Sequence, residues 1–150
     1  MVIIRGMEFP RPIRILLIED NPAEVRLARE VFKGSSLTKD ITVVSNGEDA
    51  IMFLRKKGNF SETPYPDLIL LDLKLPGKTG IDVLKYVKSD ESINHIPIVV
   101  LTSSRDEGDI KECYRHCANC YVVKPTNFTQ FKEIVKSIED FWFSTVQLPA

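Results

Sequence analysis

The chain has 150 residues, which fits one ordinary domain and is too short for two. Its 20 Lys and Arg residues nearly balance its 21 Asp and Glu residues, so its charge argues against a nucleic-acid-binding protein, and its apolar runs are too short to cross a membrane. Its 3 cysteines, an odd number, argue against a disulfide framework and indicate a reducing, cytoplasmic compartment.

Strand-like and helix-like segments alternate along the chain. Runs of apolar and β-branched residues predict strands at 13–18, 41–44, 68–71, 96–101 and 120–123. Apolar spacing and capping residues predict five helices. They run from Pro22 to just before Gly34, over 48–57, from a Thr79–Asp82 capping pair to 89, over 106–116, and onward from just after Asn127. Residues 58–66 contain one Gly and two Pro and predict a long connecting loop.

Five strand–helix units in succession predict an α/β fold. Its sheet is expected to be five-stranded, parallel and doubly wound, with helices on both faces. The segment 68–71 is apolar at every position, which is typical of a strand buried on both faces. Because ligands bind at the carboxyl ends of the strands in such sheets, the residues that follow the strands are the candidates for a functional site.

Charged and polar residues end or follow four of the predicted strands: Glu19 with Asp20, Asp72, Thr102 and Lys124. Three clustered carboxylates repel one another, and Mg²⁺, a hard cation that prefers oxygen ligands, would bind them. A carboxylate beside bound Mg²⁺ can attack a phosphoryl group and form an aspartyl phosphate. An ammonium group and a hydroxyl group would then bind the phosphoryl oxygens. Each residue alone is ordinary, and their combination at one edge carries the prediction.

These residues lie in motifs by which the chain resembles a response regulator receiver domain. The motifs are Ile18-Glu19-Asp20-Asn21-Pro22, Leu70-Leu71-Asp72-Leu73-Lys74-Leu75-Pro76, Gly80, Val100-Leu101-Thr102-Ser103 and Tyr121-Val122-Val123-Lys124-Pro125. The resemblance covers about residues 13 to 140. It implies the (βα)₅ flavodoxin-like three-layer receiver fold.

The resemblance also implies a role for each matching residue. Asp72 would be the phosphoacceptor; Glu19, Asp20, Asp72 and the backbone carbonyl of Lys74 would bind Mg²⁺; Thr102 and Lys124 would bind the phosphoryl group; Tyr121 would be the aromatic switch residue. Glu19 stands where many receivers carry Asp, so its contact with Mg²⁺ is expected through water or through its longer side chain. The implied function is that of a response regulator in a two-component phosphorelay, which takes its phosphoryl group from a sensor histidine kinase and loses it slowly by autodephosphorylation.

Some features outside these motifs resemble the small single-domain regulators that are paired with bacterial phytochromes. They are the extended loop at 58–66, Asn119-Cys120-Tyr121 and the ending Phe141-Trp142-Phe143-Ser144-Thr145 with Leu148-Pro149. This closer resemblance implies a phytochrome-type sensor histidine kinase as the partner.

The expected domain organisation is an N-terminal extension at 1–12, a receiver domain at 13–143 and a C-terminal tail at 144–150. The segment after Lys124 holds one helix and a tail, so we expect output through contacts with another protein or through homodimerisation. Phe141, Trp142 and Phe143 cannot all face one core, because consecutive helical residues point about 100° apart. We therefore expect them to form a homodimer or partner interface; the alternative is a tail folded back on its own core.

Other functions are open alternatives. A pseudo-receiver that only binds partners is the main one, although the full set of acidic, Thr and Lys residues argues against it. An aspartate-nucleophile phosphatase of the haloacid dehalogenase kind needs an acid two positions after the nucleophile, where this chain has Lys74. A flavodoxin-like cofactor binder needs a phosphate-binding loop after the first strand, where Glu19 and Asp20 would repel phosphate.

A group of possible zinc ligands, Cys113, His116, Cys117 and Cys120, lies within eight residues. A structural zinc site needs four ligands in tetrahedral geometry, and Cys120 begins the next predicted strand. Small buried side chains and a surface histidine at a helix end are the favoured interpretation.

Overall fold

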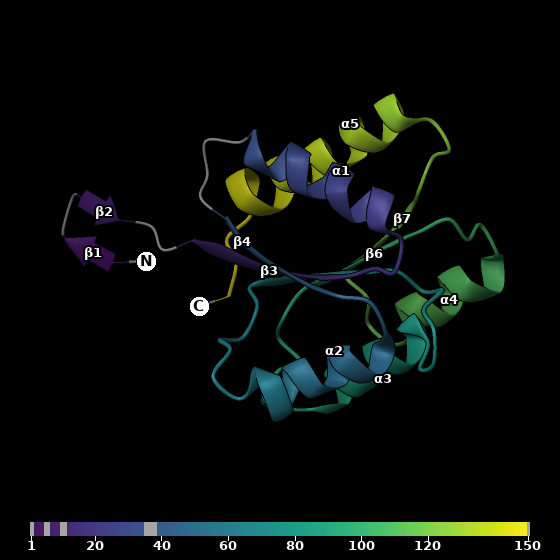
Figure 1. The fold of residues 1–150 in the computed structure, drawn as a ribbon, viewed down its shortest axis with the longest axis horizontal. Coiled ribbons are helices and arrows are strands. Elements are labelled where there is room, and N and C mark those ends of the chain that lie inside the picture. The colour runs from purple at the N-terminus through teal and green to yellow at the C-terminus, as the bar shows by residue number, and fades with distance from the viewer. Residues whose placement is uncertain (1, 5–6, 10–11, 35–38, 150) are drawn as a thin grey trace.

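A five-stranded parallel sheet forms the middle layer of the computed structural model, which describes residues 2–4, 7–9, 12–34 and 39–149 (Figure 1). Its strands are β3 (Ile13–Ile18), β4 (Lys39–Val44), β5 (Leu68–Leu71), β6 (Ile98–Thr102) and β7 (Cys120–Val123). Their spatial order is β4-β3-β5-β6-β7, and every neighbouring pair is parallel. The predicted α/β fold with a doubly wound parallel sheet is confirmed.

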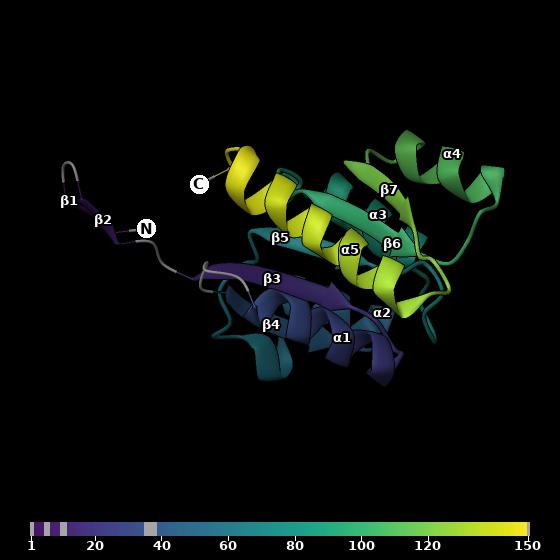
Figure 2. The same ribbon diagram turned by 90° about the horizontal axis from the view of Figure 1, so that it is seen from above.

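Helices cover both faces of the sheet. The five helices are α1 (Pro22–Lys33), α2 (Gly47–Leu54), α3 (Gly80–Ser89), α4 (Glu107–Arg115) and α5 (Phe128–Glu139). Figures 1 and 2 show α1 and α5 together on one face and α2, α3 and α4 on the other. The molecule therefore has three layers.

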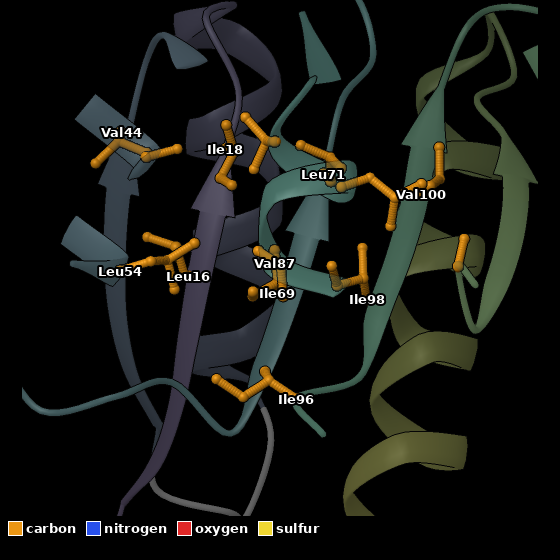
Figure 3. Packing of buried hydrophobic residues seen from close by; sticks show 14 of the residues in the cluster. Leu16, Ile18, Val44, Leu54, Ile69, Leu71, Val87, Ile96, Ile98 and Val100 are labelled. Carbon is orange, nitrogen blue, oxygen red and sulfur yellow. The ribbon is translucent and has the colours of Figure 1, made fainter. Parts of the chain in front are cut away.

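The core lies on both sides of the sheet because side chains alternate along each strand. On β5, Leu68 and Leu70 point toward α1 and α5, whereas Ile69 and Leu71 point toward the other three helices. All four are at most 1% exposed, as the uninterrupted apolar run predicted. Figure 3 shows the cluster on the side of α2, α3 and α4, in which Ile69 and Leu71 lie beside residues of β3 and β6.

Several predicted boundaries need correction. The second helix was expected to reach 57, but α2 ends at Leu54, and Lys56 has a φ of 55°, outside the helical region. The fourth strand was expected to begin at 96; it begins at Ile98, since Pro97 has no N–H group to donate. The second strand begins earlier than expected, at 39, and the predicted loop 58–66 contains a short 3₁₀ helix, η1 (Gly58–Phe60).

The two ends of the chain contain structure that the sequence patterns did not predict. Within the expected extension 1–12, β1 (Val2–Ile4) and β2 (Met7–Phe9) form an antiparallel hairpin that does not join the main sheet. Figures 1 and 2 show this hairpin beyond the start of β3. After α5 the chain continues as a π-helical segment, η2 (Asp140–Thr145). The described helices include none long and apolar enough to span a bilayer.

Candidate functional site

The candidate site lies where β3 and β5 adjoin at the centre of the sheet. After β3 the chain turns to α1 on one face, and after β5 it turns to α3 on the other, which is the kind of switch point where such sheets bind ligands. The register pairs Ile18 with Leu71, so the next residues, Glu19 and Asp72, lie side by side. The Asp72 N–H group donates a hydrogen bond of 3.0 Å to the Ile18 carbonyl oxygen, which fixes this alignment.

Three carboxylates gather at this point. Glu19, Asp20 and Asp72 each offer an oxygen, and these oxygens lie within 4.8 Å of one another. Glu19 is only 4% exposed, and within the described part of the chain its Oε2 atom is buried without a hydrogen-bond partner. A set of hard oxygen donors with one buried, unpartnered acceptor fits Mg²⁺ or Mn²⁺. The predicted acidic cluster is therefore present and suited to a divalent cation.

Lys124 lies among these carboxylates. The register pairs Thr102 with Val123, and the Lys124 N–H group donates to the Thr102 carbonyl oxygen at 2.7 Å, which brings its side chain to the same edge. Lys124 Nζ donates to Glu19 Oε1 at 2.6 Å and to Asp72 Oδ2 at 3.2 Å. It also donates to Glu24 Oε2 at 2.6 Å. The ammonium group balances part of the negative charge of the site.

Glu24 was not among the predicted site residues. The sequence indicated it only as an early residue of the first helix, three positions after the cap Asn21. In the structure, Asn21 Oδ1 accepts hydrogen bonds from the N–H groups of Ala23 and Glu24, and the Glu24 carboxylate binds Lys124 instead of closing a capping box. A signal was available, because an acid in the first turn of a helix that starts at a strand end lies near that end.

Burial and the neighbouring charged groups shift the pKa values in this cluster. Burial, followed by the carboxyl groups of Glu24 and Asp72, raises the pKa of Glu19 to about 10, although Lys124 opposes this. Burial acts to raise the pKa of Asp72. A hydrogen bond from the Glu19 carboxyl group and the positive charge of Lys124 outweigh burial and hold this pKa below its usual value. Burial acts to lower the pKa of Lys124, but its hydrogen bonds to Glu19 and Glu24 raise it above its usual value. At neutral pH, Asp72 is thus an ionised carboxylate beside a charged ammonium group.

Thr102 and Tyr121 connect the site to the α4 side of the sheet. Thr102 is fully buried, and within the described residues its Oγ1 atom has no hydrogen-bond partner. Tyr121 pairs with Val100, two residues before Thr102, and its ring packs against the core on the α2–α4 face. The Tyr121 hydroxyl donates to the Ser104 carbonyl oxygen at 2.9 Å. The aromatic residue is therefore already half-buried and tied to the β6–α4 connection.

The loop after Asp72 is folded closely against it. The Lys74 N–H group donates to Asp72 Oδ1 at 3.3 Å, and the Gly80 N–H group donates to the Leu73 carbonyl oxygen at 2.9 Å. A Cβ atom on Gly80 would lie 2.3 Å from the Asp72 carbonyl oxygen, so this motif position requires glycine. The cation-binding role of the Lys74 carbonyl stays a prediction.

The three predicted interface aromatics do not share one surface. Trp142 and Phe143 pack against the core on the α1–α5 side, and the Phe143 ring centroid lies 6.1 Å from that of Phe32. Phe141 is 51% exposed. Two of these three aromatic residues thus fold back on the core of the chain, and Phe141 is the one of the three that stays exposed for a partner.

The possible zinc ligands are spread over different surroundings. Cys113 is buried in the core, Cys117 is exposed just after α4, and Cys120 is half-buried on β7. Among the described residues, the group of acidic, His and Cys side chains close enough to hold a metal ion is the one formed by Glu19, Asp20 and Asp72.

A doubly wound sheet in the order β4-β3-β5-β6-β7, with a triad of acids, a threonine and a lysine at its switch point, is the arrangement of a receiver domain. The family profile described as response regulator receiver domain matches residues 15–136. The chain belongs to this family and is a response regulator of the receiver type.

Individual relatives are similar over nearly the whole chain. Response regulator Rcp1 of Synechocystis sp. is 42% identical over 139 residues, which cover 93% of this chain and 95% of Rcp1. The crystal structure of the phosphorylated cyanobacterial phytochrome response regulator RcpA matches with a TM-score of 0.91 and 43% identity, covering 93% of this chain and 100% of RcpA. The Mn²⁺-bound form of Rcp1 also matches with a TM-score of 0.91, at 42% identity, over 93% of this chain and 100% of that one.

Proposed function

We propose that this protein is a phosphorylation switch of a two-component phosphorelay, which accepts a phosphoryl group on Asp72 from a sensor histidine kinase in the cytoplasm. The observation that carries the proposal is the position of the Asp72 carboxylate, 3.2 Å from Lys124 Nζ and beside two further acids at the switch point of the sheet. Similarity to RcpA and to the bacteriophytochrome response regulator AtBRR, at 38% identity, supports a phytochrome-type kinase as the donor.

Asp72 supplies the nucleophile. One carboxylate oxygen forms a bond to the phosphorus of the donor's phosphohistidine, while the phosphorus–nitrogen bond breaks and its electron pair stays on the imidazole nitrogen. The lowered pKa of Asp72 keeps the carboxylate ionised for this attack at neutral pH. Hydrolysis by water later returns the carboxylate and inorganic phosphate, which accounts for a slow autodephosphorylation.

The remaining residues of the site neutralise and orient the transferred group. Glu19, Asp20 and Asp72, with the Lys74 carbonyl, would hold Mg²⁺, which when bound supplies positive charge against the phosphoryl oxygens. The Lys124 ammonium exchanges a carboxylate partner for a phosphoryl oxygen. The buried Thr102 hydroxyl donates to another phosphoryl oxygen.

The signal leaves the site through Thr102 and Tyr121. When the Thr102 hydroxyl moves toward the phosphoryl group, the space beside Tyr121 changes, and the population of Tyr121 bound to the Ser104 carbonyl shifts. This alters the surface formed by α4, β7 and α5. The output is contact with a partner protein or formation of a homodimer that includes the exposed Phe141.

The test is the intact mass of the protein after incubation with acetyl phosphate, with Mg²⁺ and with a chelator. We expect one phosphoryl adduct that requires Mg²⁺ and is absent in Asp72→Asn. Asp40→Asn, which removes the same charge from an exposed residue of β4, is the matched control and should gain the adduct normally.

Absence of an adduct in the folded wild type, both with acetyl phosphate and with an autophosphorylated phytochrome-type kinase, would contradict the proposal. That result would favour the alternative of a pseudo-receiver that acts as a phosphorylation-independent interaction module. An adduct that persists in Asp72→Asn would contradict the assignment of Asp72.

A further inference from the structure

The loop between β5 and α3 is held at its outer end by helix α2. The Lys78 N–H group donates a hydrogen bond of 2.8 Å to Glu48 Oε1, across 30 residues of sequence. Glu48 is the second residue of α2, and this helix end is fixed by its own cap, since Asn46 Oδ1 accepts from the Asp49 N–H group at 2.8 Å. The Glu48 carboxylate therefore reaches the loop from a capped helix end.

Two glycines permit this close approach. Gly77 has a φ of 71°, and a Cβ atom there would lie 2.4 Å from Glu48 Oε1. On the other side of the contact, a Cβ atom on Gly47 would lie 2.2 Å from the Lys78 carbonyl oxygen. The loop tip and the start of α2 are thus packed without room for a side chain between them.

The same loop begins with the residues of the site. Lys74 follows Asp72 by two positions, and its N–H group donates to Asp72 Oδ1. Under the proposed function, on which this inference rests, its carbonyl oxygen is a ligand of the divalent cation. We propose that Glu48 is a positioning residue for this cation site: it fixes Lys78 and thereby the conformation of the loop that carries Lys74.

Glu48 acts at a distance from the reaction and contacts neither the cation nor the phosphoryl group. Without its carboxylate, the exposed tip at Pro76, Gly77 and Lys78 samples more conformations. The Lys74 carbonyl then spends a smaller fraction of time in ligating geometry, and the apparent cation affinity falls by that fraction.

The test compares the wild type with Glu48→Ala and Glu48→Gln. Hydrogen–deuterium exchange of the metal-free proteins reports on the Lys78 amide, and calorimetric titration with Mn²⁺ reports on the site. In Glu48→Ala we expect exchange at Lys78 to become about tenfold faster and Mn²⁺ affinity to fall about tenfold. Glu48→Gln keeps an acceptor oxygen, so its exchange at Lys78 and its Mn²⁺ affinity should stay close to those of the wild type.

Glu62→Ala removes the same charge from an exposed residue and should change neither quantity. Unchanged exchange in Glu48→Ala overturns the proposal, and so does faster exchange with unchanged Mn²⁺ affinity, which would make the contact merely structural. If Glu48→Gln behaves like Glu48→Ala, the effect is one of charge and the positioning role is wrong. These outcomes leave the proposed function standing, whereas a wild type that binds no Mn²⁺ overturns both.

Discussion

Lys124 is the residue whose surroundings decide the chemistry of the site. It is 8% exposed, yet its pKa is raised, because its hydrogen bonds to Glu19 and Glu24 outweigh the effect of burial. Its Glu24 partner offers the ammonium group a carboxylate that is not a candidate cation ligand. When a cation binds Glu19 and Asp72, Lys124 can therefore keep the Glu24 carboxylate as its countercharge.

Glu24→Gln should weaken cation binding. The neutral amide holds the ammonium group less well, so Lys124 stays on Glu19 and Asp72 and competes with the cation for them. We expect Mn²⁺ affinity, measured by calorimetry, to fall about 3- to 10-fold. Glu30→Gln, an exposed change on the same helix, is the control. An affinity unchanged in Glu24→Gln would show that Lys124 does not compete with the cation.

Cys113 predicts a pH dependence of stability. Burial raises the pKa of its thiol from 9.0 to about 11. Above pH 9 the unfolded chain ionises this thiol while the folded chain keeps the proton, so the contribution of Cys113 to stability is complete below pH 9 and is lost as the pH rises to about 11. Wild type should lose about 1 to 3 kcal/mol more than Cys113→Ala between pH 8.5 and pH 11 in urea unfolding. Parallel pH profiles of the two proteins would contradict this.

At the scale of elements, the sequence patterns located every strand of the main sheet and each of the helices α1 to α5. They did so because local signals were strong: the Thr79–Asp82 pair forms the predicted capping box, and Asn127 caps α5. The errors lie at boundaries that depend on backbone conformation, such as the left-handed Lys56 that follows α2. The hairpin β1–β2 was missed because its short strands lack clear alternation.

Gly80 and Gly34 provide a matched test of how α3 approaches the site. A Cβ atom at Gly80 would lie 2.3 Å from the Asp72 carbonyl oxygen, whereas at Gly34 the nearest atom is 3.5 Å away and φ is −72°. Gly80→Ala should destabilise the fold by about 2 kcal/mol or more in urea unfolding. Gly34→Ala should be neutral or stabilising by up to about 1 kcal/mol. If both substitutions changed the free energy of unfolding by similar amounts, α3 would be able to shift away from the Asp72 backbone at little cost.

At the scale of the whole molecule, the C-terminal aromatics divide between the core and the surface. Trp142 and Phe143 attach η2 to the α1–α5 face, and Phe141 remains exposed. This division agrees with the expectation that three consecutive helical residues cannot all face one core. That expectation could not say which residue points outward, because that depends on the π-helical turn after α5.

Phe141→Ala and Trp142→Ala should therefore behave differently. If Phe141 belongs to the proposed homodimer, its replacement should shift the dimer toward the monomer in analytical ultracentrifugation and change the free energy of unfolding by less than about 0.5 kcal/mol. Trp142→Ala should lower the free energy of unfolding by about 2 kcal/mol, since it removes a packed ring. A monomeric wild type at high concentration, with and without phosphorylation, would contradict the dimer.

Sequence patterns alone specify the fold class and the residues at the strand ends. Those signals are local: an apolar run, a cap or a motif occupies a few neighbouring residues, and the rule that parallel strands end at one edge brings Glu19, Asp72 and Lys124 together. The hydrogen-bond partners of these residues depend on the tertiary structure. Lys124 binds Glu19 and Glu24 across 105 and 100 residues, and such contacts depend on strand register and side-chain direction, which no local pattern encodes.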